Sequence, residues 1–421
     1  MGDRRLRWGA MLVTCAVAVA ACGSDSDDDG GGGPVTLTMW TRSVTAAQSE
    51  ALVEAYNASH ENQIELTVVP FEQYLQTVGA AARGDDLPDL LAANVIDGPN
   101  YASQGLWQDL GDRIAELEYA DTLAPSHIRA AEWEGGTYAV PHVIDVSALY
   151  YNEVLLEQAG LDPANPPATL AELADAAGQV AESGDAGGLY LPGNCAGCLV
   201  FTVFPSIWAS GGTVMNEDGT AATLDTPQSL EVFGAYHDMF ASGAMLPESR
   251  NETGPTQNEA FAAGSAAFAL LGSKALGTIE ENDQLRMGVA PIPGMAGGTS
   301  TFVGGDIVGI SSSASDAEAD AAWEFLDWSM SEQVQLDIYA KDLFIPVRTD
   351  LADNQYAAED PRLLLFNELV AQGETPYSVR FFQTFNDPNG PWLAMFREAV
   401  FGAGPEAAAP MNADVTASLA G

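Results

Sequence analysis

Residues 35–69, VTLTMWTRSVTAAQSEALVEAYNASHENQIELTVV, decide the fold class. Two short β-type runs, at 35–40 and 64–69, lie on either side of residues 46–59, where apolar side chains recur with the spacing of one helix face. A third apolar run of strand length, PDLLAA, follows at 88–93. Because strands and helices alternate along the chain, the sequence predicts a layered α/β fold.

Later segments continue this alternation. The chain has 421 residues, which is too many for one small core and natural for two lobes. Its patterns predict further helices at 71–82, around 101–105, and at 170–182, 323–330 and 333–340. The segments 136–140 and 148–151 are expected to flank a crossing.

The N-terminus reads as an export signal. Arg4, Arg5 and Arg7 precede an apolar run at 8–21 that is too short for a stable membrane span. The run ends in VAAC, and small residues before Cys22 resemble a bacterial lipobox. We therefore expect residues 1–21 to be a lipoprotein signal peptide and Cys22 to carry lipid. The alternative is an ordinary signal peptide with an incidental cysteine.

The segment that follows suits a tethered protein. Residues 22–34 are acidic and rich in glycine, so they cannot bury a core and are expected to form a flexible linker. No later stretch approaches a transmembrane run. The expected location is the outer face of the cell membrane, with the membrane reached only through the lipid.

The charge balance restricts the partners. The chain holds 59 acidic and 15 basic residues, for a net charge of −44, and Lys274 and Lys341 are its only lysines. Such a field repels nucleic acid, so no nucleic-acid partner is expected. Extreme acidity with almost no lysine also suggests a salty habitat, where counterions screen the self-repulsion.

Cys195 and Cys198 form a Cys-Ala-Gly-Cys motif. In an oxidising exterior the default is a disulfide, although a redox-active pair stays open. The motif is only half a zinc site, and the four histidines are scattered, so no metal is expected. The sequence contains no nucleophile elbow and no nucleotide-binding glycine motif. We therefore predict that the protein is not an enzyme and needs no cofactor.

Several phrases carry a family resemblance by their order and spacing. They are LTMW at 37–40, FEQY at 71–74, LPDLLAANVIDGPNYASQGLWQDL at 87–110, GTYAVPHVIDVSALYYNEVLLEQAGL at 136–161, IWASGGTVMNEDG at 207–219, EAFAAGSAAFALLGS at 259–273 and DLFIPVRTD at 342–350. With these phrases the chain resembles the family-1, maltose-binding-protein-like extracellular solute-binding proteins of bacterial carbohydrate ABC importers. The resemblance implies a two-lobed periplasmic-binding-protein-like fold, a sugar in the interlobe cleft, and permease subunits as partners. A monomer is expected.

The same resemblance implies discontinuous lobes joined by a hinge of crossing strands. The expected N-terminal lobe comprises 35–144 and 303–346, and the C-terminal lobe comprises 149–299 and 347–421. The expected hinge crossings lie at 145–148 and 300–302, with a further reversal at 346–347.

Candidate ligand-binding residues follow from the chemistry of sugars. Aromatic rings cover the apolar faces of a sugar, while carboxylates, amides and arginines bind its hydroxyl groups. Such groups are expected after strand ends, where Trp40, Thr41 and Arg42 follow one strand and Asn94 and Asp97 another. The alternatives are a core role for Trp40, a solvated charge for Arg42, and turn or cap roles for the other two.

Other candidates come from the resemblance. Asp145 lies seven residues before Asn152, where relatives place a carboxylate that binds hydroxyl groups. His142 lies in the same segment, and a structural role remains open for it. Three aromatic residues are expected to stack on sugar or to lie in the core, namely Phe201, Trp208 and Trp392.

Two further segments complete the expected ligand-binding site: Ser273 with Lys274, and Gly304 to Asp306. Many relatives have a tryptophan just after the phrase that ends at Ser273, but this chain has Lys274 there. The lysine suggests an anionic or highly hydroxylated ligand, unless it is a surface residue. Gly304, Gly305 and Asp306 lie where relatives allow the backbone to approach the ligand. A secreted glycan-active enzyme and a sensor-accessory or adhesion protein stay open as alternatives to the transport receptor.

Overall fold

The computed structural model describes residues 33–184, 186–254 and 256–421, without the side chain of Glu72. The expected signal peptide, the lipidation site at Cys22 and nearly all of the expected linker lie outside the described residues. Within the described part, no helix is both long and apolar enough to cross a membrane.

The predicted α/β fold is confirmed, beginning with its first unit. Strand β1 (Thr36–Arg42), helix α1 (Ala46–Ser59) and strand β2 (Gln63–Val69) follow one another, and β1 pairs in parallel with β2 and with β3 (Leu90–Asn94). Helix α1 buries Leu52, Val53 and Tyr56. Burial of this apolar stripe against the sheet is the main stabilising term for such a helix.

The main sheet has eight strands. Their order is β2-β1-β3-β12-β6-β8-β7, and β9 also pairs with β6. The strands not yet bounded are β6 (Val140–Asn152), β7 (Gly187–Tyr190), β8 (Ala266–Gly272), β9 (Met287–Ala290) and β12 (Val303–Ile310). Strand β12 is antiparallel to both β3 and β6, so a late segment of the chain lies in the middle of the sheet.

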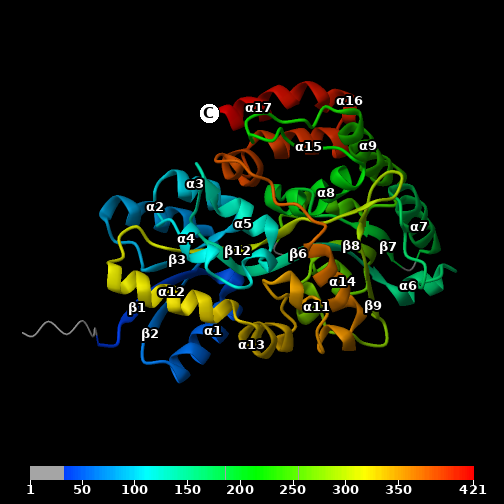
Figure 1. Cartoon of the computed structure of the whole chain (residues 1–421). Helices are drawn as coiled ribbons and strands as arrows, with labels where there is room; N and C mark the ends of the chain where they lie inside the picture. The colour runs from blue at the N-terminus through cyan, green and yellow to red at the C-terminus, as the bar shows by residue number, and fades with distance from the viewer. Residues whose placement is uncertain (1–32, 185, 255) are drawn as a thin grey trace, which may run out of the picture. The chain divides into compact units, whose positions relative to one another are not determined.

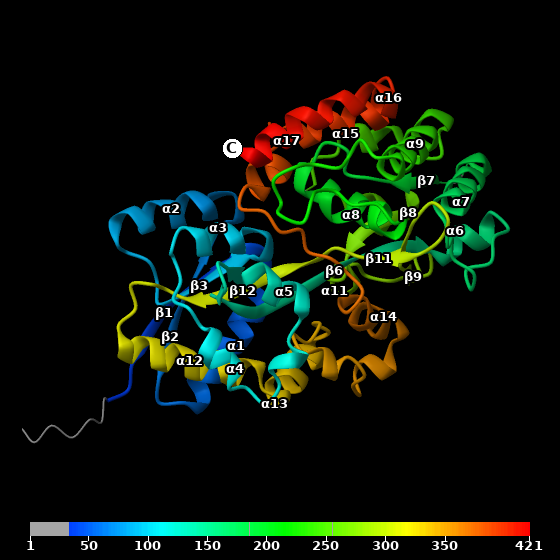
Figure 2. The same cartoon turned by 45° about the horizontal axis from the view of Figure 1, so that its top comes forward.

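Strand β6 connects the two halves of this sheet (Figures 1 and 2). It pairs with β12 as far as Val146, and from Ser147 onward it pairs with β8. The segments expected at 136–140 and 148–151 to flank a crossing fall in β5 (Gly136–Thr137) and in β6. Strand β6 runs through the crossing as one strand of 13 residues that is buried along nearly its whole length. This change of partners falls within the predicted crossing at 145–148, while the lobe boundaries remain a prediction.

Helices cover both faces of each half. On the β2-β1-β3 half, α2 (Tyr74–Gly84) and α3 (Gly98–Ser103) lie on one face, and α1 and α12 (Asp316–Met330) on the other (Figures 1 and 2). On the other half, α7 (Leu170–Ser183), α8 (Ala196–Ala209) and α14 (Pro361–Val370) contact the strands. Helix α9 (Pro227–Ser242) packs on α7 and α8, and α15 (Pro391–Phe401) packs on α9. The last helix, α17 (Asn412–Ala420), has nine residues. The other strands and α-helices are short: β4 (Glu132–Trp133), β5 (Gly136–Thr137), β10 (Ile292–Pro293), β11 (Thr299–Ser300), α4 (Gly111–Ala115), α5 (Pro125–Ala131), α6 (Glu153–Gln158), α10 (Glu259–Ala262), α11 (Ala275–Thr278) and α16 (Pro405–Ala408).

Two expected helices differ in detail. The helix expected at 71–82 begins at Tyr74, after a 3-10 turn at Phe71–Gln73. The helix expected at 333–340 is α13 (Glu332–Val334) followed by a π-helical turn at Gln335–Tyr339. Within that turn the side chain of Gln335 donates to the Ser329 carbonyl and accepts from the Val347 amide, so long-range hydrogen bonds tie it into the interior.

Candidate functional site

A cavity of about 1100 Å³ opens between the two halves of the sheet. This volume is slightly above the usual range of small-molecule sites, which is roughly 300–1,000 Å³. Its wall combines four charged side chains, five aromatic rings and several amides: Arg42, Asp97, Asp145, Lys274; Phe71, Tyr74, Phe201, Phe302, Phe382; Gln76, Asn94, Asn194, Gln257, Asn386.

Strand ends supply one side of this wall. Arg42 is the last residue of β1 and Asn94 the last of β3, and these strands are parallel neighbours. The carboxyl ends of parallel neighbours meet at one edge of a sheet, which brings the two side chains together. Asp97 ends the 3-10 turn Val95–Asp97 that follows β3, and the side chain of Asn94 caps that turn.

A buried ion pair lies behind this edge. The Arg42 guanidinium donates to the Asp306 carboxylate, and Thr45 Oγ1 donates to the same carboxylate over 2.5 Å. Both charged side chains are almost fully buried. Burial opposes the charged form of Arg42, but the charge and hydrogen bond of Asp306 outweigh it, so the pKa of Arg42 is raised.

Asp97 is the second carboxylate near Arg42. Burial raises the pKa of Asp97 to about 7, against the opposing attraction of the Arg42 charge. Asp97 is thus the acidic group of the wall whose protonation changes near neutral pH.

Asp145 projects from the middle of β6, where the strand changes partners. Its Oδ1 accepts a hydrogen bond of 2.7 Å from Ser273 Oγ. A Cβ on Gly272 would lie 2.9 Å from both carboxylate oxygens of Asp145, so the glycine makes room for this side chain. Gly305 has a φ of +113°, and a Cβ there would lie 1.9 Å from the Val143 carbonyl oxygen. Glycine is therefore required where β12 passes β6 beside the cavity.

Phenylalanine rings form part of the apolar wall, beside aliphatic side chains. The rings of Phe201 and Phe302 have centroids 5.5 Å apart. Phe71 lies 5.8 Å from the Arg42 guanidinium carbon, in cation–π range, and its side chain is 42% exposed, so an apolar face is open to a ligand. Phe382 completes this set from the segment before α15.

Lys274 lies at the edge of the cavity but its ammonium is already engaged. Lys274 Nζ donates to the backbone carbonyl of Val44 over 3.1 Å. This bond joins the segment after β8 to the segment after β1.

Eight of the predicted ligand-binding residues line the cavity: Arg42, Asn94, Asp97, Asp145, Phe201, Lys274, Gly304 and Gly305. The structure corrects the expected position of the others. Trp40 is half-buried and packs against the core. Thr41 and His142 are buried, and both contact the Ser49 hydroxyl, at 2.9 and 2.8 Å.

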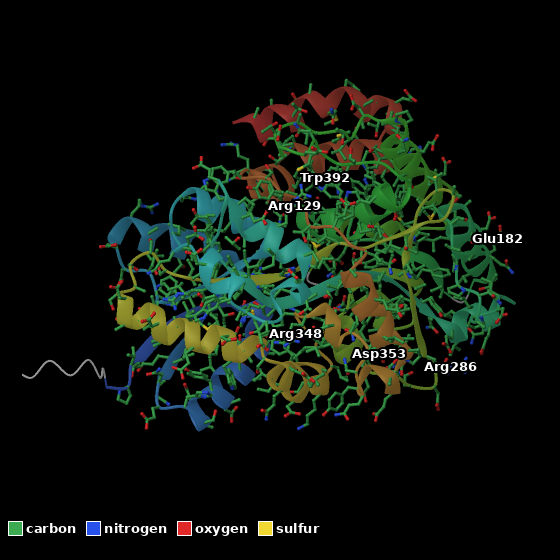
Figure 3. All side chains as sticks on the ribbon, viewed as in Figure 1. Arg129, Glu182, Arg286, Arg348, Asp353 and Trp392 are labelled. Atoms are coloured by element: carbon green, nitrogen blue, oxygen red, sulfur yellow. A yellow bond between two sulfur atoms is a disulfide. The ribbon has the colours of Figure 1, made fainter. Side chains whose placement is uncertain are left out.

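Four more predicted residues lie behind the wall. Ser273 supports Asp145, and Asp306 is fully buried against Arg42. Trp208 and Trp392 belong to an aromatic core around Phe204. Trp392, labelled in Figure 3, is 0% exposed, and its Nε1 donates to the Ala196 carbonyl over 3.3 Å. A ring so enclosed by α8, α9 and α15 has no free face for a sugar.

The structure also contains a disulfide between Cys195 and Cys198, and both residues line the cavity. Among the residues described, no group of three or more histidine, cysteine, aspartate or glutamate side chains is arranged to hold a metal ion.

Some wall residues were missed from the sequence. Phe302 lies just before β12, whereas Phe382 and Asn386 lie together in one turn about 80 residues later, and the local sequence of neither segment carries a distinguishing pattern. Phe71 belongs to the FEQY phrase of the family resemblance, which was the available signal for it.

The sequence model of bacterial extracellular solute-binding proteins matches residues 51–364, well over half of the chain. This chain belongs to the bacterial extracellular solute-binding proteins. Members of this family bind solutes outside the cytoplasm, so the location of this solute-binding protein is extracytoplasmic.

Solved structures share its architecture. The cyclic α-maltosyl-1,6-maltose-binding protein of Arthrobacter globiformis has a TM-score of 0.79 and 26% identity, over 92% of this chain and 100% of that one. The GacH receptor of Streptomyces glaucescens, whose structures include a complex with acarbose, has a TM-score of 0.78 and 26% identity, over 92% and 98%.

A third comparison is with a curated relative. The sn-glycerol-3-phosphate-binding periplasmic protein of Brucella melitensis is 23% identical over 73% of this chain and 74% of its own length. The compared proteins are thus binding proteins with several different ligands.

Proposed function

We propose that this solute-binding protein captures a neutral sugar or oligosaccharide in its cavity and delivers it to the permease of an ABC importer. The observation that carries the proposal is the wall itself, which contains phenylalanine rings together with carboxylates and amides. Rings of this kind cover the apolar faces of a sugar, while the carboxylates and amides accept hydrogen bonds from its hydroxyl groups. The sugar-binding proteins of similar fold support the same ligand class.

The charges favour a neutral ligand over an anionic one. Each cation of the wall already has an acceptor, since Arg42 binds Asp306 and Lys274 binds the Val44 carbonyl. The wall also contains the acidic side chains of Asp97 and Asp145, and the whole chain has a net charge of −44. This negative field opposes the binding of an anion.

Binding would close the two lobes over the sugar without covalent chemistry. The proposed lobes are 35–144 with 303–346 and 149–299 with 347–421, and the proposed hinge is the crossing at 145–148 and 300–302. Each lobe contributes part of the wall, so only a closed state completes the contacts.

A thermal-shift panel tests the proposal. Maltose, maltotetraose, acarbose, mannotriose and sn-glycerol 3-phosphate are added at saturating concentration, because a ligand that binds only the folded state raises the melting temperature. At least one neutral sugar should raise it by several degrees and remain unhydrolysed. A rise with sn-glycerol 3-phosphate alone would contradict the neutral class, and hydrolysis of a bound oligosaccharide would indicate an enzyme.

We further propose that Cys22 is the lipidated first residue of a monomeric mature protein. Replacing Cys22 by alanine should release the protein from the membrane fraction or leave the leader uncut. If the Cys22→Ala protein remains bound to the membrane and is released only by detergent, the proposed lipid anchor is refuted.

A further inference from the structure

The Cys195–Cys198 disulfide lies in the wall of the cavity and at the start of a wall-forming helix. Both cysteines line the cavity and are only partly buried, so they are open to small molecules there. Cys195 Sγ accepts from the Cys198 amide over 3.2 Å and thereby caps α8. Helix α8 then carries Phe201 and Thr202 into the same wall.

A loop from a different part of the chain packs on the two sulfurs. A Cβ on Gly254 would lie 2.8 Å from Cys198 Sγ and 3.1 Å from Cys195 Sγ, and Gly254 has a φ of +108°. Only glycine fits this conformation and this distance without strain. The neighbouring residues Thr253 and Gln257 line the cavity.

The Glu252 carboxylate ties this loop to the body of the protein. It accepts from the Gly254 amide over 2.7 Å, from Thr256 Oγ1 over 2.6 Å and from the Tyr190 hydroxyl over 2.6 Å. The Glu252 backbone carbonyl accepts from the Asn194 amide over 2.8 Å, directly before the disulfide. The loop and the disulfide are therefore held as one assembly.

The wall beside the disulfide holds unused hydrogen-bonding capacity. A Cβ on Gly197 would lie 3.1 Å from Asn386 Nδ2, so Asn386 covers the first turn of α8. Asn386 Oδ1 is buried without a partner in the part of the chain that the structure describes. A buried carbonyl oxygen gains stability from a donor, and the hydroxyl of a sugar supplies one.

We infer that the Cys195–Cys198 disulfide positions this end of the cavity wall, so that its reduction weakens sugar binding. The inference rests on the proposed function for its ligand. Loss of the geometry of one hydrogen bond corresponds to a dissociation constant raised by about tenfold. Reduction transfers two electrons and two protons to the S–S bond, which breaks into two thiols, while dithiothreitol is oxidised to its cyclic disulfide.

The first experiment needs no ligand. Amide hydrogen exchange of the full chain is measured with and without dithiothreitol, and exchange should rise in 193–203 and 251–258 while α1 stays unchanged. The double variant Cys195→Ser/Cys198→Ser should show the raised exchange without reductant and no response to it. Unchanged exchange in 251–258 upon reduction would overturn the inference.

The second experiment measures affinity by calorimetry, with maltotetraose and acarbose as probes, well below the melting temperature. Reduction should raise the dissociation constant about tenfold, and reoxidation should restore it. By reciprocal linkage, the bound sugar should make the equilibrium constant for reduction of the disulfide about tenfold less favourable. This change corresponds to a reduction potential lowered by about 30 mV for two electrons. Equal affinity of both redox forms would overturn the inference. If no sugar of the panel binds, the proposed function fails, whereas the exchange experiment still decides the role of the disulfide.

A glycine pair separates positioning from stability. Gly254→Ala displaces the loop from an intact disulfide, and it should weaken binding of the same probes. Gly243→Ala is the matched control, because Gly243 also has a positive φ, +84°, but no atom lies within 4 Å of its Cβ position. Equal effects of the two variants on affinity would contradict the positioning role.

Discussion

The Arg42–Asp306 pair allows the buried charges behind the cavity to be tested quantitatively. Replacing Arg42 by alanine leaves the Asp306 carboxylate buried, with Asp97 as a second carboxylate nearby. Breaking a buried pair by removing one partner costs about 3–5 kcal/mol, because the remaining charge has lost both its solvent and its partner. We therefore expect Arg42→Ala to lower the free energy of unfolding by this amount at pH 7.

Arg113 provides the matched control. It pairs with Asp320 over 2.6 Å, but its side chain is 36% exposed and that of Asp320 is 73% exposed. Exposed pairs contribute about 0–1 kcal/mol, so Arg113→Ala should have a small effect. The double variant Arg42→Met/Asp306→Leu should recover much of the stability lost in Arg42→Ala, since the Asp306 charge is removed together with its partner.

Urea unfolding followed by tryptophan fluorescence, at a fixed salt concentration, measures these differences. The pH dependence gives a second check, because burial raises the folded-state pKa of Asp97 and Arg42→Ala removes the cation that opposes this rise. The destabilising effect of the Asp97 charge grows as pH rises above the unfolded pKa of about 4, so the stability deficit of Arg42→Ala should narrow in acid. If Arg42→Ala and Arg113→Ala destabilise equally, the reasoning about the buried pair is wrong.

Three further predictions concern the cavity, the buried histidines and the core. Asp145→Ala should weaken binding of the panel sugars by roughly ten- to a hundredfold in calorimetry. Lys274→Ala should change the affinity little, because the Lys274 ammonium binds the Val44 carbonyl. A larger loss of affinity in Lys274→Ala than in Asp145→Ala would contradict the neutral-ligand proposal. Burial lowers the pKa of His127 and His142 to about 4. The stability that depends on their neutral forms is therefore present above about pH 6.5 and is lost as pH falls toward 4. Replacing both histidines by glutamine should make the free energy of unfolding in urea less dependent on pH over that range. Trp392→Ala should destabilise by about 3–5 kcal/mol, while Trp392→Phe should cost less, and a Trp392→Ala protein of unchanged stability would show that this ring is not core.

Local sequence was sufficient for the fold class and for part of the wall. The alternation of strands and helices predicted β1, α1 and β2 within one or two residues of their bounds. It also placed Arg42, Asn94 and Asp97 at strand ends, and all three line the cavity. Parallel strands bring their carboxyl ends to one edge wherever this pattern occurs, so the prediction needs no knowledge of distant contacts.

Which face of a side chain remains open was decided only by the tertiary structure. Trp392 and Phe382 lie ten residues apart, yet Trp392 is enclosed by α8, α9 and α15 while Phe382 lines the cavity. Lys274 likewise has an ordinary local sequence, and its partner Val44 is 230 residues away. An amino-acid pattern encodes burial and helix or strand period, but the neighbours of a ring or an ammonium come from segments that meet only when the chain has packed.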